Sequence, residues 1–217
     1  MTSTALNRYW TNKGYFEGAR CLKKWGYLHR LDGPAIIHDD GKKEWWVGGL
    51  CHREDGPAVE WAGGTVEWWV DGLLHRVGGP AIERANGTKV WYLRGKIHRE
   101  DGPAFEYANG TEEWYINDQL HREDGPAIVL PNGTKRWYKR DKLHRLNAPA
   151  VELADGSKEW WVENVLHRED GPAVESNDGL IYWYLNNKWL MNLEDFVKAT
   201  PYLKTDAERL MFYLQWK

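Results

Sequence analysis

Short apolar runs alternate with polar, glycine-rich turns along most of the chain, and the pattern repeats every 23 residues. Each copy opens with a His-Arg pair, whose histidines are His29, His52, His75, His98, His121, His144 and His167. A fixed period in this range is typical of repeat proteins, in which each unit packs mainly against its neighbours. We therefore expect function to reside in a surface that is made several times over, and not in one unique pocket.

Each copy contains two strand-like runs separated by turns. In the second copy, residues 59–61 precede a Gly-Gly turn, and the run after the turn ends in Trp68-Trp69. Asn-Gly, Asp-Gly or Gly-Gly stands at the first turn of every copy, and these dipeptides favour two-residue type I′ turns. Gly and Pro recur in every period and argue against helices. The pattern predicts an all-β repeat protein, an elongated, twisted antiparallel sheet of stacked β-hairpins.

Two-residue turns at both places fix an expected strand register. The cross-strand pairs would be Val59 with Trp68, Glu60 with Glu67, Trp68 with His75, and Trp69 with Leu74. Side chains alternate between the faces of a strand, so Arg76 would share a face with Glu67 and Trp69. This favours a structural ladder of Arg and Glu over a ligand-binding role for the arginines. A bulge in the first turn would shift the register.

The two ends of the chain depart from the repeat. We expect an N-terminal capping segment over residues 1–28, seven hairpin repeats over 29–190, and a C-terminal helical cap over 191–217. A short helix should run from Leu193 to Ala199. Thr205 and Glu208 have the spacing of a capping box, which predicts a last helix after Thr205. Such a helix most simply covers the last strand, and the alternative is a partner-binding or dimerising helix.

Composition excludes several classes of protein. Lys and Arg number 29 against 32 Asp and Glu, which argues against a nucleic-acid or acidic-membrane surface. The first residues lack the apolar run of a signal peptide, and no stretch approaches the ~20 apolar residues of a membrane helix. Cys21 and Cys51 are isolated, as expected for buried thiols in a reducing compartment. We expect a soluble, cytoplasmic protein, stabilised in large part by its 15 Trp and 11 Tyr.

The recurring polar residues do not predict catalysis. The histidines lie one full repeat apart, so they do not converge as metal ligands must, and no metal or other cofactor is expected. Carboxylate pairs such as Glu60 and Glu67 recur on an open sheet, whereas an active site is normally unique. Turn geometry explains the Asp-Gly-Pro-Ala element, with Gly supplying an unusual φ and Pro a bend. Ala148 replaces Gly in the sixth copy, which implies that positive φ is not strictly required.

The most complete copy reads His121-Arg122-Glu123-Asp124-Gly125-Pro126-Ala127, followed by Asn-Gly-Thr and Trp-Tyr. These motifs, over about residues 26–189, resemble the MORN-like variant repeats of bacteriophage and large-virus proteins. The resemblance implies stacked hairpins that serve as a scaffold or binding surface, in some members toward membranes or further copies, and it implies no catalysis. Ordinary MORN copies carry Gly where this chain has Arg and Asp, which argues against transferring lipid binding to it.

We therefore predict a non-enzymatic binding protein, of phage or viral origin, that engages a host protein. Aromatic and Arg side chains are enriched at binding hot spots. The candidate binding residues are Trp46, Trp69, Tyr92, Tyr115, Tyr138, Trp161, Arg53, Arg76, Arg99, Arg122, Arg145 and Arg168. One alternative is sequestration of a small nucleotide-like ligand between Arg and Trp or Tyr. Others are a membrane- or nucleic-acid-associated scaffold, a homo-oligomer, or an aromatic face that only packs on itself.

Overall fold

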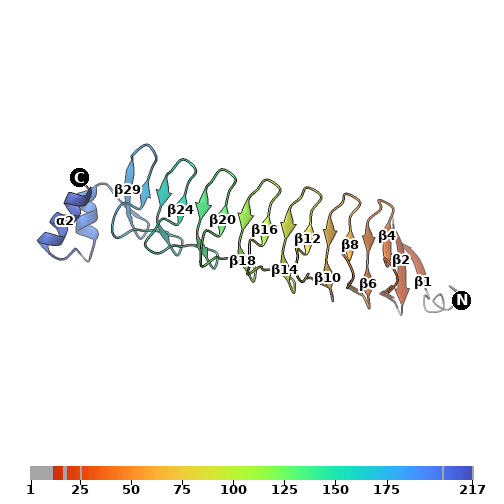
Figure 1. The fold of residues 1–217 in the computed structure, drawn as a ribbon. Helices are drawn as coiled ribbons and strands as arrows, with labels where there is room; N and C mark the ends of the chain where they lie inside the picture. Colours follow the sequence, from red (N-terminus) through yellow and green to blue (C-terminus); the bar gives the residue numbers. More distant parts are fainter. Residues whose placement is uncertain (1–11, 17–18, 25, 202, 217) are drawn as a thin grey trace. The chain divides into compact units, whose positions relative to one another are not determined.

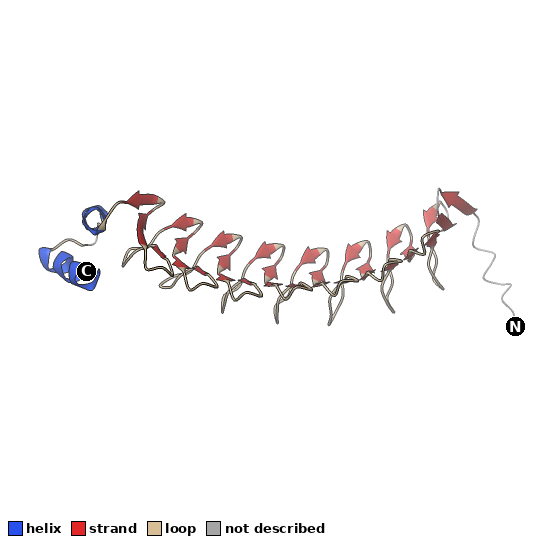
Figure 2. Ribbon diagram, turned by 90° about the horizontal axis from the view of Figure 1, so that it is seen from above, coloured by secondary structure: helices blue, strands red, loops and turns tan. Residues whose placement is uncertain are grey.

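The computed structural model describes residues 12–16, 19–24, 26–201 and 203–216, and it groups the chain into two compact units, residues 1–109 and 110–217. The predicted all-β repeat with a C-terminal helical cap is confirmed (Figure 1). The unit boundary falls in the fourth Asn-Gly turn, at Asn109 and Gly110, although the unbroken period favours a single domain. In each unit, antiparallel hairpins stand side by side, and loops link their strands (Figure 2).

Unit 1 contains the lead-in segment and the first repeats. Three lead-in strands, β1 (Asn12–Phe16), β2 (Ala19–Lys24) and β3 (Tyr27–Leu28), join the sheet because β2 pairs with both of the others and with β4. The strands of the ladder that follows are β4 (Ile36–His38), β5 (Lys43–Glu44), β8 (Val59–Glu60), β9 (Val66–Glu67), β12 (Ile82–Glu83), β13 (Lys89–Val90) and β16 (Phe105–Glu106). Smaller two-stranded ribbons lie between these hairpins: β6 (Trp46–Val47) with β7 (Leu50–Cys51), β10 (Trp69–Val70) with β11 (Leu73–Leu74), and β14 (Tyr92–Leu93) with β15 (Lys96–Ile97).

Unit 2 repeats this arrangement. Its ladder strands are β17 (Glu112–Glu113), β20 (Ile128–Val129), β21 (Lys135–Arg136), β24 (Val151–Glu152), β25 (Lys158–Glu159), β28 (Val174–Glu175) and β29 (Ile181–Leu185). Its ribbons are β18 (Tyr115–Ile116) with β19 (Gln119–Leu120), β22 (Tyr138–Lys139) with β23 (Lys142–Leu143), and β26 (Trp161–Val162) with β27 (Val165–Leu166), while β29 itself pairs with β30 (Lys188–Leu190). The helices α1 (Leu193–Ala199) and α2 (Asp206–Trp216) follow.

The first turn of each copy is not the predicted two-residue turn. In the second copy Val59 pairs with Glu67, so the predicted pairs of Val59 with Trp68 and Glu60 with Glu67 are wrong by one residue. The amide of Gly64 donates to the Trp61 carbonyl at 2.9 Å, and the Trp61 amide donates to Thr65, which closes a three-residue loop. Gly64 has φ +90°, as expected for a type I turn that ends in a glycine bulge.

The second turn of each copy is the predicted type I′ turn. Asp71 and Gly72 both have positive φ, and Trp69 pairs with Leu74 as expected. The predicted pairing of Trp68 with His75 is also confirmed, because the His75 amide donates to the Trp68 carbonyl at 3.0 Å.

The interior of each repeat is small. The alanine that ends each heptapeptide is buried, at Ala35, Ala58, Ala81, Ala104, Ala127, Ala150 and Ala173. A hydroxyl side chain after the first turn accepts a hydrogen bond from the next repeat; Thr88, for example, accepts from the Ala108 amide at 3.2 Å. Neighbouring repeats are thus joined by backbone pairing and specific hydrogen bonds, not by a deep core.

The helical cap has the largest apolar cluster, and both predicted helices are present. Asn192 caps α1 by accepting from the Asp195 amide, and Thr205 and Glu208 exchange the two bonds of the predicted capping box. The cluster packs helix side chains on the last hairpin; its buried members are Trp183, Leu190, Phe196, Val197, Leu203 and Phe212. The prediction that the helices cover the last hairpin is confirmed.

Candidate functional site

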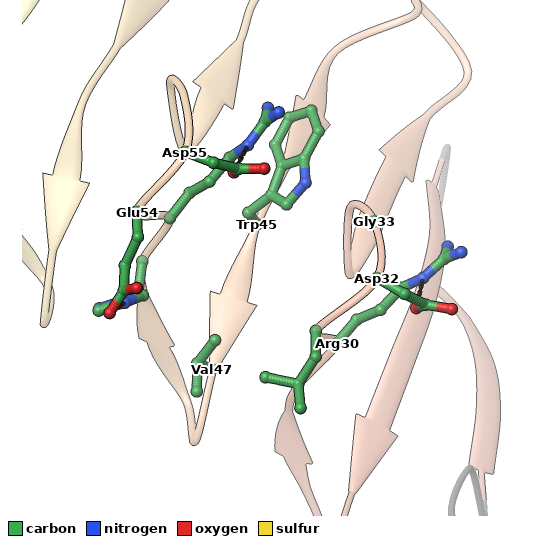
Figure 3. Close-up of a pocket in the computed structure, with 10 residues that line it drawn as sticks. Arg30, Asp32, Gly33, Trp45, Val47, Glu54 and Asp55 are labelled. Carbon is green, nitrogen blue, oxygen red and sulfur yellow. Dashed lines mark hydrogen bonds and ion pairs between the residues drawn. The ribbon is translucent and has the colours of Figure 1, made fainter. Parts of the chain in front are cut away.

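The arginine of each heptapeptide is held by its own loop and by a tryptophan. Arg53 donates from Nε to Asp55 at 2.8 Å, and from Nη1 to the Pro57 carbonyl and to Glu60. The plane of its guanidinium lies over the ring of Trp45, with Cζ 4.2 Å from the ring centroid. Figure 3 shows the same Arg–Asp contact in the preceding loop. These contacts use the flat guanidinium in the way that distinguishes Arg from Lys.

This arrangement recurs in both units. The stacked pairs are Arg53 on Trp45, Arg76 on Trp68, Arg99 on Trp91, Arg122 on Trp114, Arg145 on Trp137, and Arg168 on Trp160. The Arg–Glu ion pairs join Arg53 to Glu60, Arg76 to Glu83, Arg99 to Glu106, Arg145 to Glu152, and Arg168 to Glu175. The structural ladder of Arg and Glu is therefore present, with each Arg bound to the glutamate seven residues later.

The glycine of the heptapeptide has a different role from the predicted one. The φ of Gly56 lies outside the left-handed region, so the expected unusual φ is not found. A Cβ placed on Gly56 would instead lie 2.9 Å from Cζ of Arg53, closer than real Cβ atoms come. Glycine is needed because the guanidinium packs directly against its Cα.

The two copies without Asp adopt another loop conformation. Gly78 and Asn147 stand at the Asp position of these copies, and both have positive φ. Ala148 follows Asn147 outside the left-handed region, as the sequence predicted, and Arg145 still stacks on its tryptophan at 3.9 Å. Where Asp is present, as at Asp55, the hydrogen bond from Arg53 lowers the pKa of the carboxyl group.

The histidines link successive repeats. Nδ1 of His52 accepts a hydrogen bond from the amide of Asp71 at 3.1 Å, and Nδ1 of His29 accepts from Gly48 at 3.0 Å. Each acceptor receives the amide of the first residue of the next type I′ turn. Partial burial, with a smaller contribution from the charge of Lys24, lowers the pKa of His29. Over the described part of the chain, no group of three or more His, Cys, Asp or Glu side chains could hold a metal ion.

The six predicted aromatic residues, here called the aromatic row, are Trp46, Trp69, Tyr92, Tyr115, Tyr138 and Trp161, and all are half-buried. Trp69 donates from Nε1 to Glu67 at 2.9 Å, and Trp46 and Trp161 make the same bond to the glutamate two residues before them. The expectation that Arg76 shares a face with Trp69 is wrong, since Arg76 lies on Trp68. The structure does not bring the predicted arginines and the aromatic row together into one site, because the bulged first turn changes the register.

The aromatic row contributes to a hollow in unit 1. Its volume is about 410 Å³, and Trp46 and Trp69 line it together with Leu50 and Trp61. Leu50 is 48% exposed and Trp61 is 42% exposed. Trp61 was not among the predicted site residues, although its apolar neighbours in the sequence signalled a strand. We call this site the aromatic hollow.

Cys51 and Lys42 also line the aromatic hollow. Burial and the nearby charges of Glu44 and Glu67 raise the pKa of the Cys51 thiol to about 12, so the thiol is a poor nucleophile. Cys51 is a buried free thiol, as predicted, whereas the side chain of Cys21 lies outside the described residues. Lys42 lies over the ring of Trp61 at 3.9 Å, which leaves one cation at the rim.

No model of a known protein family matches the chain, and no curated protein matches its sequence. The resemblance to MORN-like repeats therefore rests on the heptapeptide and its period alone. The described residues include no helix with the length and apolar character needed to cross a bilayer.

Proposed function

We propose that the protein is a non-enzymatic binding protein that engages a partner protein through the aromatic hollow of unit 1. The observation that carries the proposal is the hollow itself, where Leu50 and Trp61 remain exposed beside two half-buried tryptophans. Exposed aromatic and aliphatic groups that line a concavity are typical of protein interfaces. The resemblance to phage and large-virus repeats supports a host protein as the partner.

The test combines capture with site-directed crosslinking. A photoreactive phenylalanine derivative at position 61 should crosslink a discrete partner in a candidate host lysate. The double variant Leu50→Glu/Leu73→Glu should weaken binding of that partner at least tenfold, because it places two charges beside the hollow. Both leucines are about half exposed, so the fold should be retained.

The matched control is Leu146→Glu, which adds a charge at an exposed leucine in unit 2, outside the hollow. It should leave binding unchanged. Equal binding by the Leu50→Glu/Leu73→Glu variant and the wild type would rule out the hollow as the interface.

Sequestration of a nucleotide-like ligand has less structural support. It requires a guanidinium and an aromatic residue of the row to face each other across a ligand, whereas Arg53 lies on Trp45 and bonds to its own loop. Calorimetry against a nucleotide panel would reveal stoichiometric binding if this function applied.

A further inference from the structure

A second groove lies in unit 1 between the heptapeptide loops that begin at His29 and His52. Its volume is about 640 Å³. Trp45 and Val47 form part of its lining, and Arg30 and Gly33 belong to the first loop (Figure 3). None of its lining residues belongs to the aromatic hollow, so the groove is a separate site.

The last repeat has an equivalent place that is filled from within the chain. Six periods after Trp45 and Arg30, Trp183 and Arg168 occupy the same positions of the repeat. Leu190 stands where the next histidine would be, and no eighth heptapeptide follows. The second loop that bounds the groove in unit 1 is therefore missing here, and helix α2 lies in its place.

Trp216 of α2 packs on this last loop. Its ring centroid lies 5.4 Å from Cζ of Arg168 and 5.7 Å from the ring of Trp183. A Cβ on Gly171 would lie 2.5 Å from Cζ2 of Trp216, so the ring rests directly on the glycine. The side chain of Arg168 is 14% exposed, against 28% for Arg30. The surface formed by Arg and Gly in the heptapeptide thus accepts an aromatic side chain.

The rim of the groove in unit 1 is acidic. The side chains of Glu54 and Asp55 are 89% and 84% exposed, whereas that of Arg53 is 22% exposed. The exposed charge beside the groove is therefore negative. A cation next to the bound aromatic group would complement it.

We propose that this groove binds an aromatic side chain flanked by basic residues on a partner polypeptide. Gly33 and Arg30 would contact the ring as Gly171 and Arg168 contact Trp216, and Glu54 and Asp55 would face the flanking cations. The site does not depend on the aromatic hollow.

The test is an NMR titration of the full-length protein with the blocked peptide Lys-Trp-Lys, followed through backbone amide shifts. We expect a saturable shift of the Gly33 amide at millimolar peptide. The Gly171 amide should not respond, because Trp216 already covers it. The Ala148 amide should not respond either, because Ala148 carries a Cβ at the glycine position. The control peptide Lys-Ala-Lys should leave Gly33 unshifted.

The chain offers its own sequence for a blocked site. The variant Asp32→Asn/Gly33→Ala copies the Asn147-Ala148 dipeptide of the sixth copy, whose arginine still stacks on its tryptophan. It should weaken Lys-Trp-Lys about tenfold, the value of one good ring contact. Asp32→Asn alone should bind within about twofold of the wild type, since it leaves Gly33 unchanged.

Three results would overturn the proposal: no saturable shift at Gly33, an equal shift with Lys-Ala-Lys, or unchanged affinity of the double variant. If the double variant does not fold, Glu54→Lys takes its place. Glu54 contacts only His52 at 3.8 Å among the ion pairs of its loop, so its replacement should spare the fold and weaken binding. Unchanged affinity of Glu54→Lys would then refute the acidic rim.

Discussion

At the scale of single residues, the heptapeptide is a device for holding one guanidinium. Asp, the Pro carbonyl and Glu accept its N–H groups, Trp covers one face, and Gly allows close approach, as Arg53 shows. Exposed ion pairs usually contribute little, but a stacked and multiply hydrogen-bonded Arg contributes more than a single pair. The recurrent arginines are explained by stability before any ligand is invoked.

Replacing Arg53 by Lys should therefore destabilise the protein. Lysine cannot make the Nε bond to Asp55 together with the Nη1 bonds, and it loses the flat stack on Trp45. We expect the free energy of unfolding to fall by about 1–2 kcal/mol, measured by urea denaturation. Arg94→Lys, in an exposed type I′ turn, is the control and should be nearly silent. Equal effects at the two sites would contradict this role for the heptapeptide.

At the scale of elements, each type I′ turn is fastened to the repeat before it. The amide of Gly72 donates to the Cys51 carbonyl, and the amide of Asp71 donates to Nδ1 of His52. Several turns hold non-glycine residues at positive φ, such as Glu163, whose amide donates to His144. Strain of this kind persists where the surroundings impose it, and these hydrogen bonds supply the constraint.

Stability should therefore decrease in mild acid. The pKa of His29 is lowered in the folded protein, so the unfolded chain binds more protons at this site. Its contribution is complete above the ordinary value of 6.5 and is lost as the pH falls below that value toward the lowered pKa. We expect the urea midpoint to drop between pH 7 and pH 5.

The variant His29→Asn retains an acceptor oxygen but does not titrate, so its midpoint should vary less over this range. The carboxyl groups do not explain the same window. The hydrogen bond from Arg30 lowers the pKa of Asp32, so its contribution is lost only below about 3.8. A midpoint that stays constant from pH 7 to pH 5 in the wild type would refute the histidine linkage.

At the scale of the whole molecule, stability is local. Backbone pairing and a few side-chain bonds join neighbouring repeats within each unit, and the densest apolar cluster lies in the helical cap. Phe196 is fully buried there, 4.6 Å from the ring of Trp183. In repeat proteins, a local defect loosens its neighbours and leaves distant repeats folded.

Phe196→Ala should accordingly cost about 3–5 kcal/mol within the cap. Hydrogen exchange resolved by peptide should speed up over residues 181–216 and remain unchanged over the strands of unit 1. Leu214→Ala, at an exposed position of the same cap, is the control. Faster exchange throughout unit 1 in the Phe196→Ala variant would show that stability is not local.

The sequence predicted the period, the hairpins, the type I′ turns and both helices, because each depends on local chemistry. It did not predict the bulged first turn, since Asn-Gly also fits a type I turn with glycine at the bulge. Pro131 was the available signal, because its fixed φ suits the position after Leu130 in a type I turn. The one-residue shift then placed the arginines on the wrong tryptophans. Their contact with glycine could not be predicted, because it depends on how the loop folds back on itself.

The fastening of each type I′ turn to the preceding histidine has a genetic consequence. Within a unit every junction uses the same hydrogen bonds, so gaining or losing one whole copy by recombination would recreate an existing junction and not require a new one. Copy number can then drift between lineages while every remaining junction keeps its chemistry, so an eight-copy or six-copy descendant should inherit a foldable chain.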